Sequence, residues 1–533
     1  MKISETIFKV VLVCVLSIPL VAASAYGGNP TPGFNHKIPE QIMTPDRVET
    51  RIGELEFFDG MPTDATIDKV YETLDLMRGV DVFLNFIPAA SMEAMRMGMV
   101  GIGADRSNRI MIFDTLMDSN TLFLTANTDT VYACVIMDLE KDGPTVVEIP
   151  AGAGPGTVND AFFRFVVDMG SPGPDKQKGG TYIILPPDYK GDMTPTPNTL
   201  KEDTPAKVMI GGKMQDAWIA QSRSFNNWLI LRGFLVDGKP DAATKMWKEE
   251  LKIYPLSKAQ NPPGMEHVNA SKKVFNTIHA NNYEFFKELD HVIQKEPVDF
   301  IDPELRGQAA AIGIIKGKKF NPDARMKQIL TDSVAVGNAT ARAIWLKPRD
   351  KKAFFFDDRQ WYSGFIGGDY RWLDIDGMRG RNMDARTLFF YFATVNTPAM
   401  VLEIPGVGSN YAQAARDKNG NYLDGSKTYK LNMPANVPAK DFWSIVLYDP
   451  QTRSMLQTSQ AFPSINNKID KLDYNKDGSV DLYFGPRAPK GKKANWIQTV
   501  PGKGWFTLLR LYGPLESWFD RSWKPGDFEL VNE

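Results

Sequence analysis

The segment at 121–138, TLFLTANTDTVYACVIMD, decides the fold class. Its two runs of apolar and β-branched residues, 121–125 and 131–138, flank a short polar stretch rich in Asn, Asp and Thr. Apolar runs of this length predict strands, and Asn and Asp between such runs predict a turn. The segment therefore predicts two strands joined by a turn that contains Asn127 and Asp129.

The same pattern recurs on both sides of this segment. Further short runs rich in Val, Ile, Phe and Tyr are 146–149, 162–167, 182–185, 208–210, 228–234, 442–448, 480–484 and 505–512. Turn residues separate the runs, and helices do not alternate with them as in βαβ units. We therefore predict a mainly β fold with a helical segment, α+β in class. Its core is two antiparallel β-sandwich-like domains with helices between them.

Helical periodicity appears before and between the strand-rich regions. An apolar stripe with spacings of three and four residues runs from Ile67 to Met77. Apolar residues recur at helical spacing within 241–345, where Asp302 stands before Pro303 as a helix cap. The predicted organisation is a signal peptide (1–25), an extended N-terminal arm (26–60), a β domain with N-terminal helices (61–240), a helical segment (241–345) and a second β domain (346–533).

The N-terminus has the layout of a secretory signal peptide. Lys2 and Lys9 precede an apolar run at 10–21, and small residues follow up to Ala25. We predict cleavage near Ala25 and a periplasmic or secreted mature protein. No later stretch reaches about 18 consecutive apolar residues, so the mature protein is expected to lack a membrane span.

Cysteine content and charge exclude several classes of protein. Loss of 1–25 would leave Cys134 as the one thiol, which excludes an internal disulfide. The 62 Lys and Arg nearly balance the 64 Asp and Glu, so the chain offers no electrostatic basis for binding nucleic acid. The four His lack metal-binding spacing, and we predict no resident cofactor.

The turn segment also carries a family resemblance. Residues 125–132, TANTDTVY, resemble the Pro-Asn-x-Asp-Thr-x-Tyr segment of the bacterial DUF1254 domain, with Ala126 where Pro is usual. Asp168, Tyr182 with the Gly pair before it, and Arg232 follow in the order of that family.

The C-terminal half resembles a second domain, DUF1214. The matching segments are LDG at 423–425, FWS at 442–444, DGS at 477–479 and RLYGP at 510–514. The two domains commonly occur together in exported bacterial proteins. The resemblance implies paired antiparallel β-sandwich domains with helices between them. It implies no catalytic residues, because the function of both domains is unknown.

Polar residues around the turn form the first candidate site. The candidates for ligand binding are Asn127, Tyr132, Arg164, Tyr182 and Arg232. An Arg inside an apolar strand faces solvent, pairs with a carboxylate or holds an anion. The alternative is architectural: Asn127 and Asp129 would only build the turn. The arginines would then form internal salt bridges with Asp129 or Asp168.

A second candidate is an acidic loop near the C-terminus. Asp473, Asn475 and Asp477 have the spacing that begins a calcium-binding loop. The twelfth position, which should hold a bidentate Glu, is Phe484. The pattern therefore favours a β-turn built on Asp477 and Gly478, with calcium as the alternative.

Two classes of function stay open at this point. The first is a binding or structural module for a small ligand or glycan that forms a homo-oligomer through its N-terminal arm. Trp443, Trp496 and Trp505 could stack on sugar rings or fill a core. The second is a hydrolase that uses Asp129 and Asp168 as acid and base. The distance between these two carboxylates decides between the two classes.

Overall fold

The computed structural model describes residues 38–197, 204–374 and 378–531. The predicted signal peptide and its cleavage site near Ala25 lie outside these residues. The chain divides into two compact units, Met1–Leu74 and Asp75–Glu533. Each unit is described by itself below.

The described part of the first unit is a small antiparallel sheet, not the extended arm predicted for 26–60. After η1 (Glu40–Ile42), the strands β1 (Arg47–Thr50), β2 (Gly53–Phe58) and β3 (Met61–Pro62) pair in sequence order. Asp59 and Gly60, with φ of 46° and 80°, form the tight turn between β2 and β3. An Asp-Gly pair at positive φ fits the twist of a β-hairpin. The Pro- and Gly-rich composition of 26–60 favours an extended arm instead.

Helix α1 (Asp64–Gly101) begins in the first unit and continues into the second. Its first turn is tied to the small sheet, since Thr66 Oγ1 accepts from the Glu56 amide at 2.9 Å and donates to the Glu56 carbonyl. Further along, a Cβ on Gly337 of α6 would lie 2.7 Å from Phe83 Cδ1 of α1. A glycine is therefore required where these two helices pack.

The first sandwich of the second unit has two sheets. Their strands are β4 (Arg109–Ile112), β5 (Thr130–Asp138), β6 (Thr145–Ile149), β7 (Pro155–Asp160), β8 (Phe165–Gly170), β9 (Gly180–Leu185), β10 (Ala206–Ile210), β11 (Lys213–Gln221), β12 (Asn226–Phe234), β13 (Lys252–Pro255) and β14 (Glu266–Asn269). The sheet orders are β14-β4-β5-β12-β7-β8 and β10-β11-β9-β6-β13. Alternate residues of each strand fill the space between the sheets: Val131 and Val135 of β5 share a core with Val147 of β6 and Ile184 of β9.

The second sandwich is smaller. Its strands are β15 (Ser409–Ala414), β16 (Tyr429–Met433), β17 (Ala439–Tyr448), β18 (Ser464–Asn466), β19 (Val480–Gly485), β20 (Trp496–Gln498), β21 (Phe506–Pro514) and β22 (Glu529–Leu530). They form the sheets β15-β21-β17-β18 and β20-β19-β16-β22. Most pairs are antiparallel, as predicted, and the parallel pairs across both sandwiches are β11–β9, β14–β4 and β19–β20.

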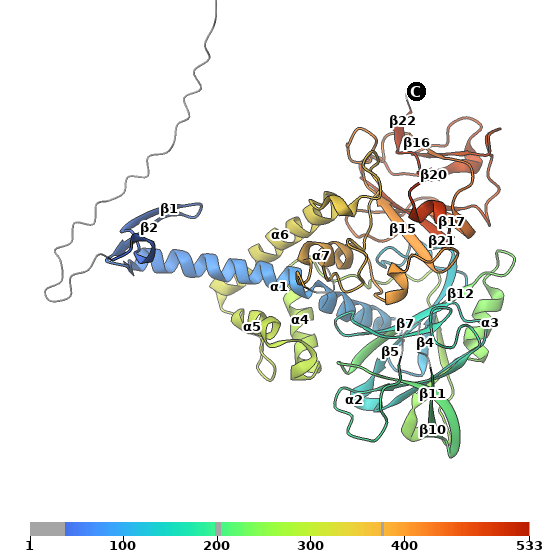
Figure 1. Cartoon of the computed structure of the whole chain (residues 1–533), viewed down its shortest axis with the longest axis horizontal. Helices are drawn as coiled ribbons and strands as arrows, with labels where there is room; N and C mark the ends of the chain where they lie inside the picture. The colour runs from blue at the N-terminus through green and yellow to red at the C-terminus, as the bar shows by residue number, and fades with distance from the viewer. Residues whose placement is uncertain (1–37, 198–203, 375–377, 532–533) are drawn as a thin grey trace, which may run out of the picture. The chain divides into compact units, whose positions relative to one another are not determined.

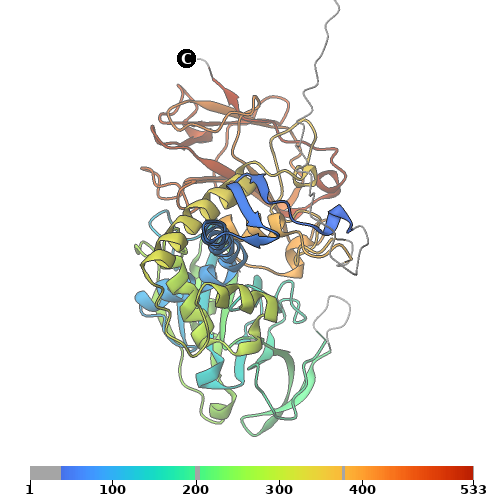
Figure 2. The same cartoon turned by 90° about the vertical axis from the view of Figure 1, so that its left-hand side faces the viewer.

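A central core joins the two sandwiches. One sheet of each sandwich turns its outer face onto the same cluster, for example Trp228 of β12 and Phe506 of β21. The helices within the described residues are α1, α2 (Leu139–Asp142), α3 (Asp241–Glu249), α4 (Glu284–Lys295), α5 (Pro303–Ala311), α6 (Ala324–Leu346), α7 (Met383–Phe392) and α8 (Glu516–Phe519). Among them α1, α4, α5, α6 and α7 contribute to this core, and both views show two groups of strands with α6 and α7 beside them (Figures 1 and 2).

The predicted α+β class with mostly antiparallel sheets is confirmed, whereas three local predictions are wrong. Residues 121–125 form no strand, and Thr125 there has a φ of 39°. Residues 162–164 form the turn between β7 and β8. The segment 241–345 contains β13 and β14 besides its helices, because these short strands complete the edges of the first sandwich.

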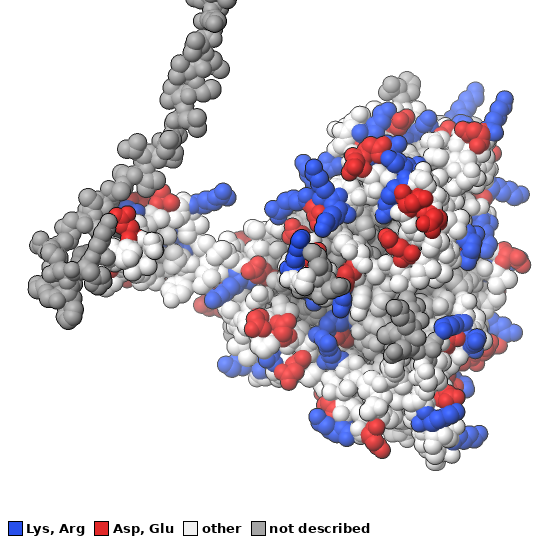
Figure 3. All heavy atoms as spheres, in the orientation of Figure 1, with Lys and Arg blue, Asp and Glu red and all other residues white. Residues whose placement is uncertain are grey.

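The surface of the second unit is mixed in charge. On the face drawn in Figure 3, basic and acidic side chains are interspersed. Within the described ranges, no helix combines the length and apolarity needed to cross a membrane.

Candidate functional site

The turn before β5 is built as the sequence predicts. Asn127 is buried, and its Oδ1 accepts from the amides of Asp129 at 2.9 Å and Thr130 at 3.1 Å. The Asn127 amide in turn donates to the Tyr132 hydroxyl at 3.3 Å. Asn127 therefore serves the backbone of the turn, in the way that Asx turns do.

The Asp129 carboxylate is held by residues of the second sandwich. Ser444 Oγ of β17 and the Tyr512 hydroxyl of β21 donate to its Oδ2 at 2.6 and 3.1 Å. Asn466 Nδ2 of β18 donates to its Oδ1 at 2.8 Å. Asp129 is 2% exposed, so these three hydrogen bonds replace the hydration of its carboxylate. We call Asn127, Asp129, Ser444, Asn466 and Tyr512 the domain joint.

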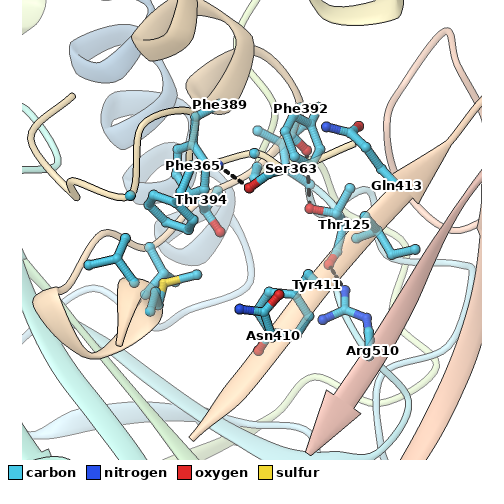
Figure 4. Close-up of a pocket in the computed structure, with 18 of the residues that line it drawn as sticks. Thr125, Ser363, Phe365, Phe389, Phe392, Thr394, Asn410, Tyr411, Gln413 and Arg510 are labelled. Carbon is cyan, nitrogen blue, oxygen red and sulfur yellow. Dashed lines mark hydrogen bonds between the residues drawn. The ribbon is translucent and has the colours of Figure 1, made fainter. Parts of the chain in front are cut away.

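A pocket of about 580 Å³, here called the central pocket, lies beside the domain joint. The first sandwich contributes Tyr132 of β5 and Arg232 of β12, and the second contributes Tyr411 of β15 and Arg510 of β21. The remaining wall is mixed. It includes apolar Phe365, Phe389, Phe392, Met400 and Leu508, polar Ser363, Thr394, Asn410 and Gln413, and charged Lys352, Glu403 and Arg521. Figure 4 shows Tyr411 and Arg510 across from Ser363, Phe365 and Phe389.

Of the three arginines that line the pocket, Arg232 and Arg510, here called the pocket arginines, have no anionic partner among the described residues. Arg510 Nη2 donates to the Thr125 carbonyl and, at 2.8 Å, to the Tyr448 hydroxyl. Its guanidinium lies 5.0 Å from the centre of the Tyr411 ring, and that of Arg232 lies 5.7 Å from the Tyr132 ring. No salt bridge involves either side chain within 38–197, 204–374 and 378–531. The salt-bridge alternative for Arg232 is therefore not realised there.

Several hydrogen-bond donors of the central pocket also lack an acceptor. Nε of Arg232, Nε of Arg510 and Nε2 of Gln413 are buried and have no partner in the described part of the chain. A buried donor without an acceptor costs about 1–3 kcal/mol, and more when it is charged. Two like charges with unsatisfied donors beside aromatic side chains are chemically able to hold an anion.

Arg164 and Tyr182 lie away from this pocket. Arg164 sits in the turn between β7 and β8, and its Nε donates to Asp160 Oδ2 at 2.6 Å. Tyr182 is buried in the first sandwich and donates to Asp175 Oδ1 at 2.5 Å. Of the predicted ligand-binding residues, the structure thus brings Tyr132 and Arg232 together at the central pocket.

The structure separates Asp168 from Asp129. Asp168 pairs with Thr157, Thr157 with Ile230, and Ile230 with Cys134 of β5. Three strand spacings of about 4.8 Å place Asp168 roughly 14 Å from β5, whose first residue follows Asp129. Thr397 Oγ1 donates to Asp168 Oδ2 at 2.8 Å, and burial raises the pKa of Asp168 to about 7. The two carboxylates therefore cannot act on one bond as acid and base.

The acidic loop at 473–479 is closed by its own hydrogen bonds. Asp477 Oδ1 accepts from the Ser479 amide at 3.0 Å, and Asn475 Nδ2 donates to Ser479 Oγ at 3.0 Å. The Asp473 amide donates to Asn495 Oδ1 at 2.9 Å. Across the described residues, no group of three or more His, Cys, Asp and Glu is arranged to hold a metal ion.

The aromatic residues considered for sugar binding serve other purposes. Trp443 and Trp505 are buried in the core of the second sandwich. Trp496 donates from its indole to the Gly485 carbonyl at 2.9 Å.

Sequence reasoning missed most of the central pocket. Tyr411, Gln413 and the segment 363–368 come from parts of the chain without a recognisable motif. The available signal was Arg232 and Arg510, each a lone Arg in an apolar strand. An Arg in that setting is costly unless something holds it, so two of them together indicate a shared cavity.

Two family models match the chain. Residues 107–255 match the model described as protein of unknown function (DUF1254), and residues 408–516 match that of protein of unknown function (DUF1214). No curated protein matches.

Two crystal structures of uncharacterised function resemble the chain. The VPA0106 protein from Vibrio parahaemolyticus is 16% identical with a TM-score of 0.48, covering 85% of this chain and 100% of that one. An uncharacterized protein from Burkholderia cenocepacia is 11% identical with a TM-score of 0.36, covering 87% and 96%. The chain thus contains a DUF1254 segment followed by a DUF1214 segment, in the order that its motifs predict.

Proposed function

We propose that the chain is a binding module for a small organic anion, such as a carboxylate with an apolar body, in the central pocket. The observation that carries this proposal is the pair Arg232 and Arg510. Their charges face one cavity, and the Nε of each lacks an acceptor among the described residues. The anionic group would accept from the two guanidinium groups, and the apolar body would lie against Phe365, Phe389 and Phe392.

The hydrolase alternative has less support than binding. Of the carboxylates in the described ranges, Glu403 is the one that lines the central pocket, and its side chain is exposed. Acid and base catalysis needs two groups within reach of the same bond. The proposal therefore stays with binding, and a glycan is disfavoured because neutral sugars would leave both arginines unpaired.

Thermal denaturation with matched ligands tests the proposal. Benzoate and hexanoate should raise the melting temperature of the full chain, whereas benzyl alcohol and hexanol should not, since a ligand bound to the folded state stabilises it. Arg232→Met should abolish the effect, and Arg106→Met, at an exposed position, should preserve it. Equal stabilisation by acids and alcohols would contradict the proposal. Mass spectrometry of the molecules that co-purify with the protein would identify the natural ligand.

We propose further that the protein is exported and that residues 1–25 are removed. The support is the sequence pattern of a charged start, an apolar run and small residues before Tyr26. N-terminal sequencing of the protein expressed in a bacterium checks this. An intact Met1 in the periplasmic fraction, or retention in the cytoplasm, would refute it.

We also propose that the protein forms homo-oligomers through its first unit. Its described residues expose large apolar side chains, among them Ile42, Phe58 and Met61, with Phe58 74% exposed. A second copy of the chain would remove this surface from water. Light scattering should give a mass above that of one chain, and Phe58→Asp with Met61→Asp should lower it. A monomeric mass for the unaltered protein would exclude the proposal.

A further inference from the structure

A second pocket of about 400 Å³ lies next to the same helix that borders the central pocket. Helix α7 contributes Phe389 and Phe392 to the central pocket, and Arg386 and Phe390 to the second one. Residues three or four apart share a helix face, so α7 presents a different face to each cavity. We call the second cavity the arginine pocket.

The arginine pocket contains buried donors without acceptors. Arg386 is 6% exposed; its Nη2 donates to Asn85 Oδ1, and its Nε has no partner in the described part of the chain. Nη2 of Arg164 and the indole nitrogen of Trp372 are also buried and unpartnered there. All three side chains line the pocket. Three unsatisfied donors around one cavity, against one unpartnered acceptor in its lining (Asn396 Oδ1), call for a ligand rich in acceptors.

Positive charge exceeds negative charge around this cavity. Five arginines line it, of which Arg371 pairs with Asp369 at 2.8 Å, and the carboxylates in the lining itself are Asp160 and Asp302. Asp160 is committed to Arg164 and to the amides of Phe162 and Arg164. Asp302 caps α5 by accepting from the Leu305 amide at 3.0 Å. Neither carboxylate forms a salt bridge with Arg386, and burial together with Arg381 lowers the pKa of Arg386 to about 10.

We propose that the arginine pocket is a second anion site, specific for a phosphoryl group. Three of its five arginines come from different elements: the β7–β8 turn (Arg164), the segment before α7 (Arg381) and α7 itself (Arg386). A planar carboxylate offers two oxygens whose acceptor sites all lie in one plane. A tetrahedral phosphoryl group offers three acceptor oxygens in different directions and up to two charges, which suits donors arriving from three sides.

The rest of the pocket favours a phosphomonoester with a ring over inorganic phosphate alone. Phe162, Phe165 and Phe390 line it together with Tyr370 and Trp372. Aromatic walls stack on a flat apolar group with about 0.5–1.5 kcal/mol beyond the area they bury. Phenyl phosphate combines both parts and is therefore the probe of choice.

Calorimetric titration of the full chain tests this site. Phenyl phosphate should bind, inorganic phosphate should bind more weakly, and benzoate should not compete for the site. Arg386→Gln and Arg381→Gln should each weaken phenyl phosphate binding about tenfold. Arg381 is exposed, so its replacement keeps the test valid if Arg386→Gln fails to fold. Arg232→Met, in the central pocket, should leave the affinity unchanged.

Four results would overturn the proposal. Absence of phenyl phosphate binding at millimolar concentration would show that the pocket is no phosphoryl site. Unchanged affinity in Arg381→Gln would place the ligand elsewhere. Loss of binding in Arg232→Met, with retention in Arg381→Gln, would assign the anion to the central pocket. Displacement of phenyl phosphate by benzoate would exclude specificity for the phosphoryl group.

Discussion

The domain joint and the central pocket both include residues of β21, but their buried polar groups differ in whether they have hydrogen-bond partners. Strand β21 sends Tyr512 into the joint and Arg510 toward the pocket, two residues apart on one face. In the joint, every oxygen of the Asp129 carboxylate accepts a hydrogen bond. In the pocket, Nε of Arg510 and Nε of Arg232 have no acceptor among the described residues.

This difference separates a structural role from a binding role. A buried group whose hydrogen bonds are complete within the chain contributes to stability. A buried charge that lacks its partner costs stability and persists where function requires it. Asp129 therefore belongs to the architecture that joins the DUF1254 and DUF1214 segments, whereas Arg232 is a residue on which the proposed binding site depends.

Asp129→Ala should cause the largest change. The substitution leaves Ser444 Oγ, Asn466 Nδ2 and the Tyr512 hydroxyl buried without their acceptor. At about 1–3 kcal/mol for each unsatisfied group, with partial relaxation, we expect a loss of about 4 kcal/mol in the free energy of unfolding. Urea denaturation followed by tryptophan fluorescence measures it.

An exposed aspartate on β17, the strand that carries Ser444, provides the control. Asp441 of β17 has a side chain that is 51% exposed, and Asp441→Ala should change the free energy of unfolding by less than about 0.5 kcal/mol. A similar small change for Asp129→Ala would show that the joint does not hold the two sandwiches together.

Replacing the two pocket arginines should separate stability from binding. Arg510→Met removes the donors to the Thr125 carbonyl and the Tyr448 hydroxyl, so we expect a loss of about 3 kcal/mol. Arg232→Met removes no hydrogen bond described within the fold and relieves repulsion from Arg510. It should therefore preserve or raise the melting temperature while binding of benzoate is lost. A strongly destabilised Arg232→Met would mean that Arg232 is structural.

Local features of both regions could be predicted from the sequence. Asn127 makes its turn with residues two and three positions away, so the residue types suffice to predict it. The partners of Asp129 could not be predicted, because Ser444 lies 315 positions away and its side chain carries no special signal. A contact between residues so far apart in the sequence depends on how the two sandwiches pack against each other.

The central pocket shows the same limit. Arg232 can be recognised from the sequence as an Arg in an apolar strand. Its neighbours in the pocket, Arg510 and the residues of α7, are brought next to it only when the central core packs. The failed strand at 121–125 has a related cause. Its apolar residues are buried in tertiary contacts, and the Thr125 amide donates to the Arg453 carbonyl at 2.9 Å. These contacts replace the strand pairing that the composition favours.

Asp168 should make stability depend on pH. Burial raises its pKa in the folded protein to about 7, above the unfolded value near 4. The folded state therefore holds an extra proton between about pH 4 and 7, and the free energy of unfolding falls as the pH rises through this interval. In Asp168→Asn, the free energy of unfolding should fall less steeply between about pH 5 and 7, by about 1 kcal/mol per pH unit, than in the unaltered protein. Denaturation curves at a series of pH values measure the slope, and an unaltered slope would contradict the assignment.

The smallest effect is expected at the acidic loop, which resembles a site in sequence and a closed turn in structure. Asp473 is exposed, and its carboxylate accepts no hydrogen bond within the described ranges, so Asp473→Ala should shift the free energy of unfolding by less than about 0.5 kcal/mol. Calcium at millimolar concentration should leave the melting temperature of both proteins unchanged, because Ser479 already occupies Asp477 Oδ1. Calcium-dependent stabilisation that Asp473→Ala removes would reverse this conclusion. The contrast with Arg232 would then fail, since a loop closed by its own hydrogen bonds would have proved to bind a ligand.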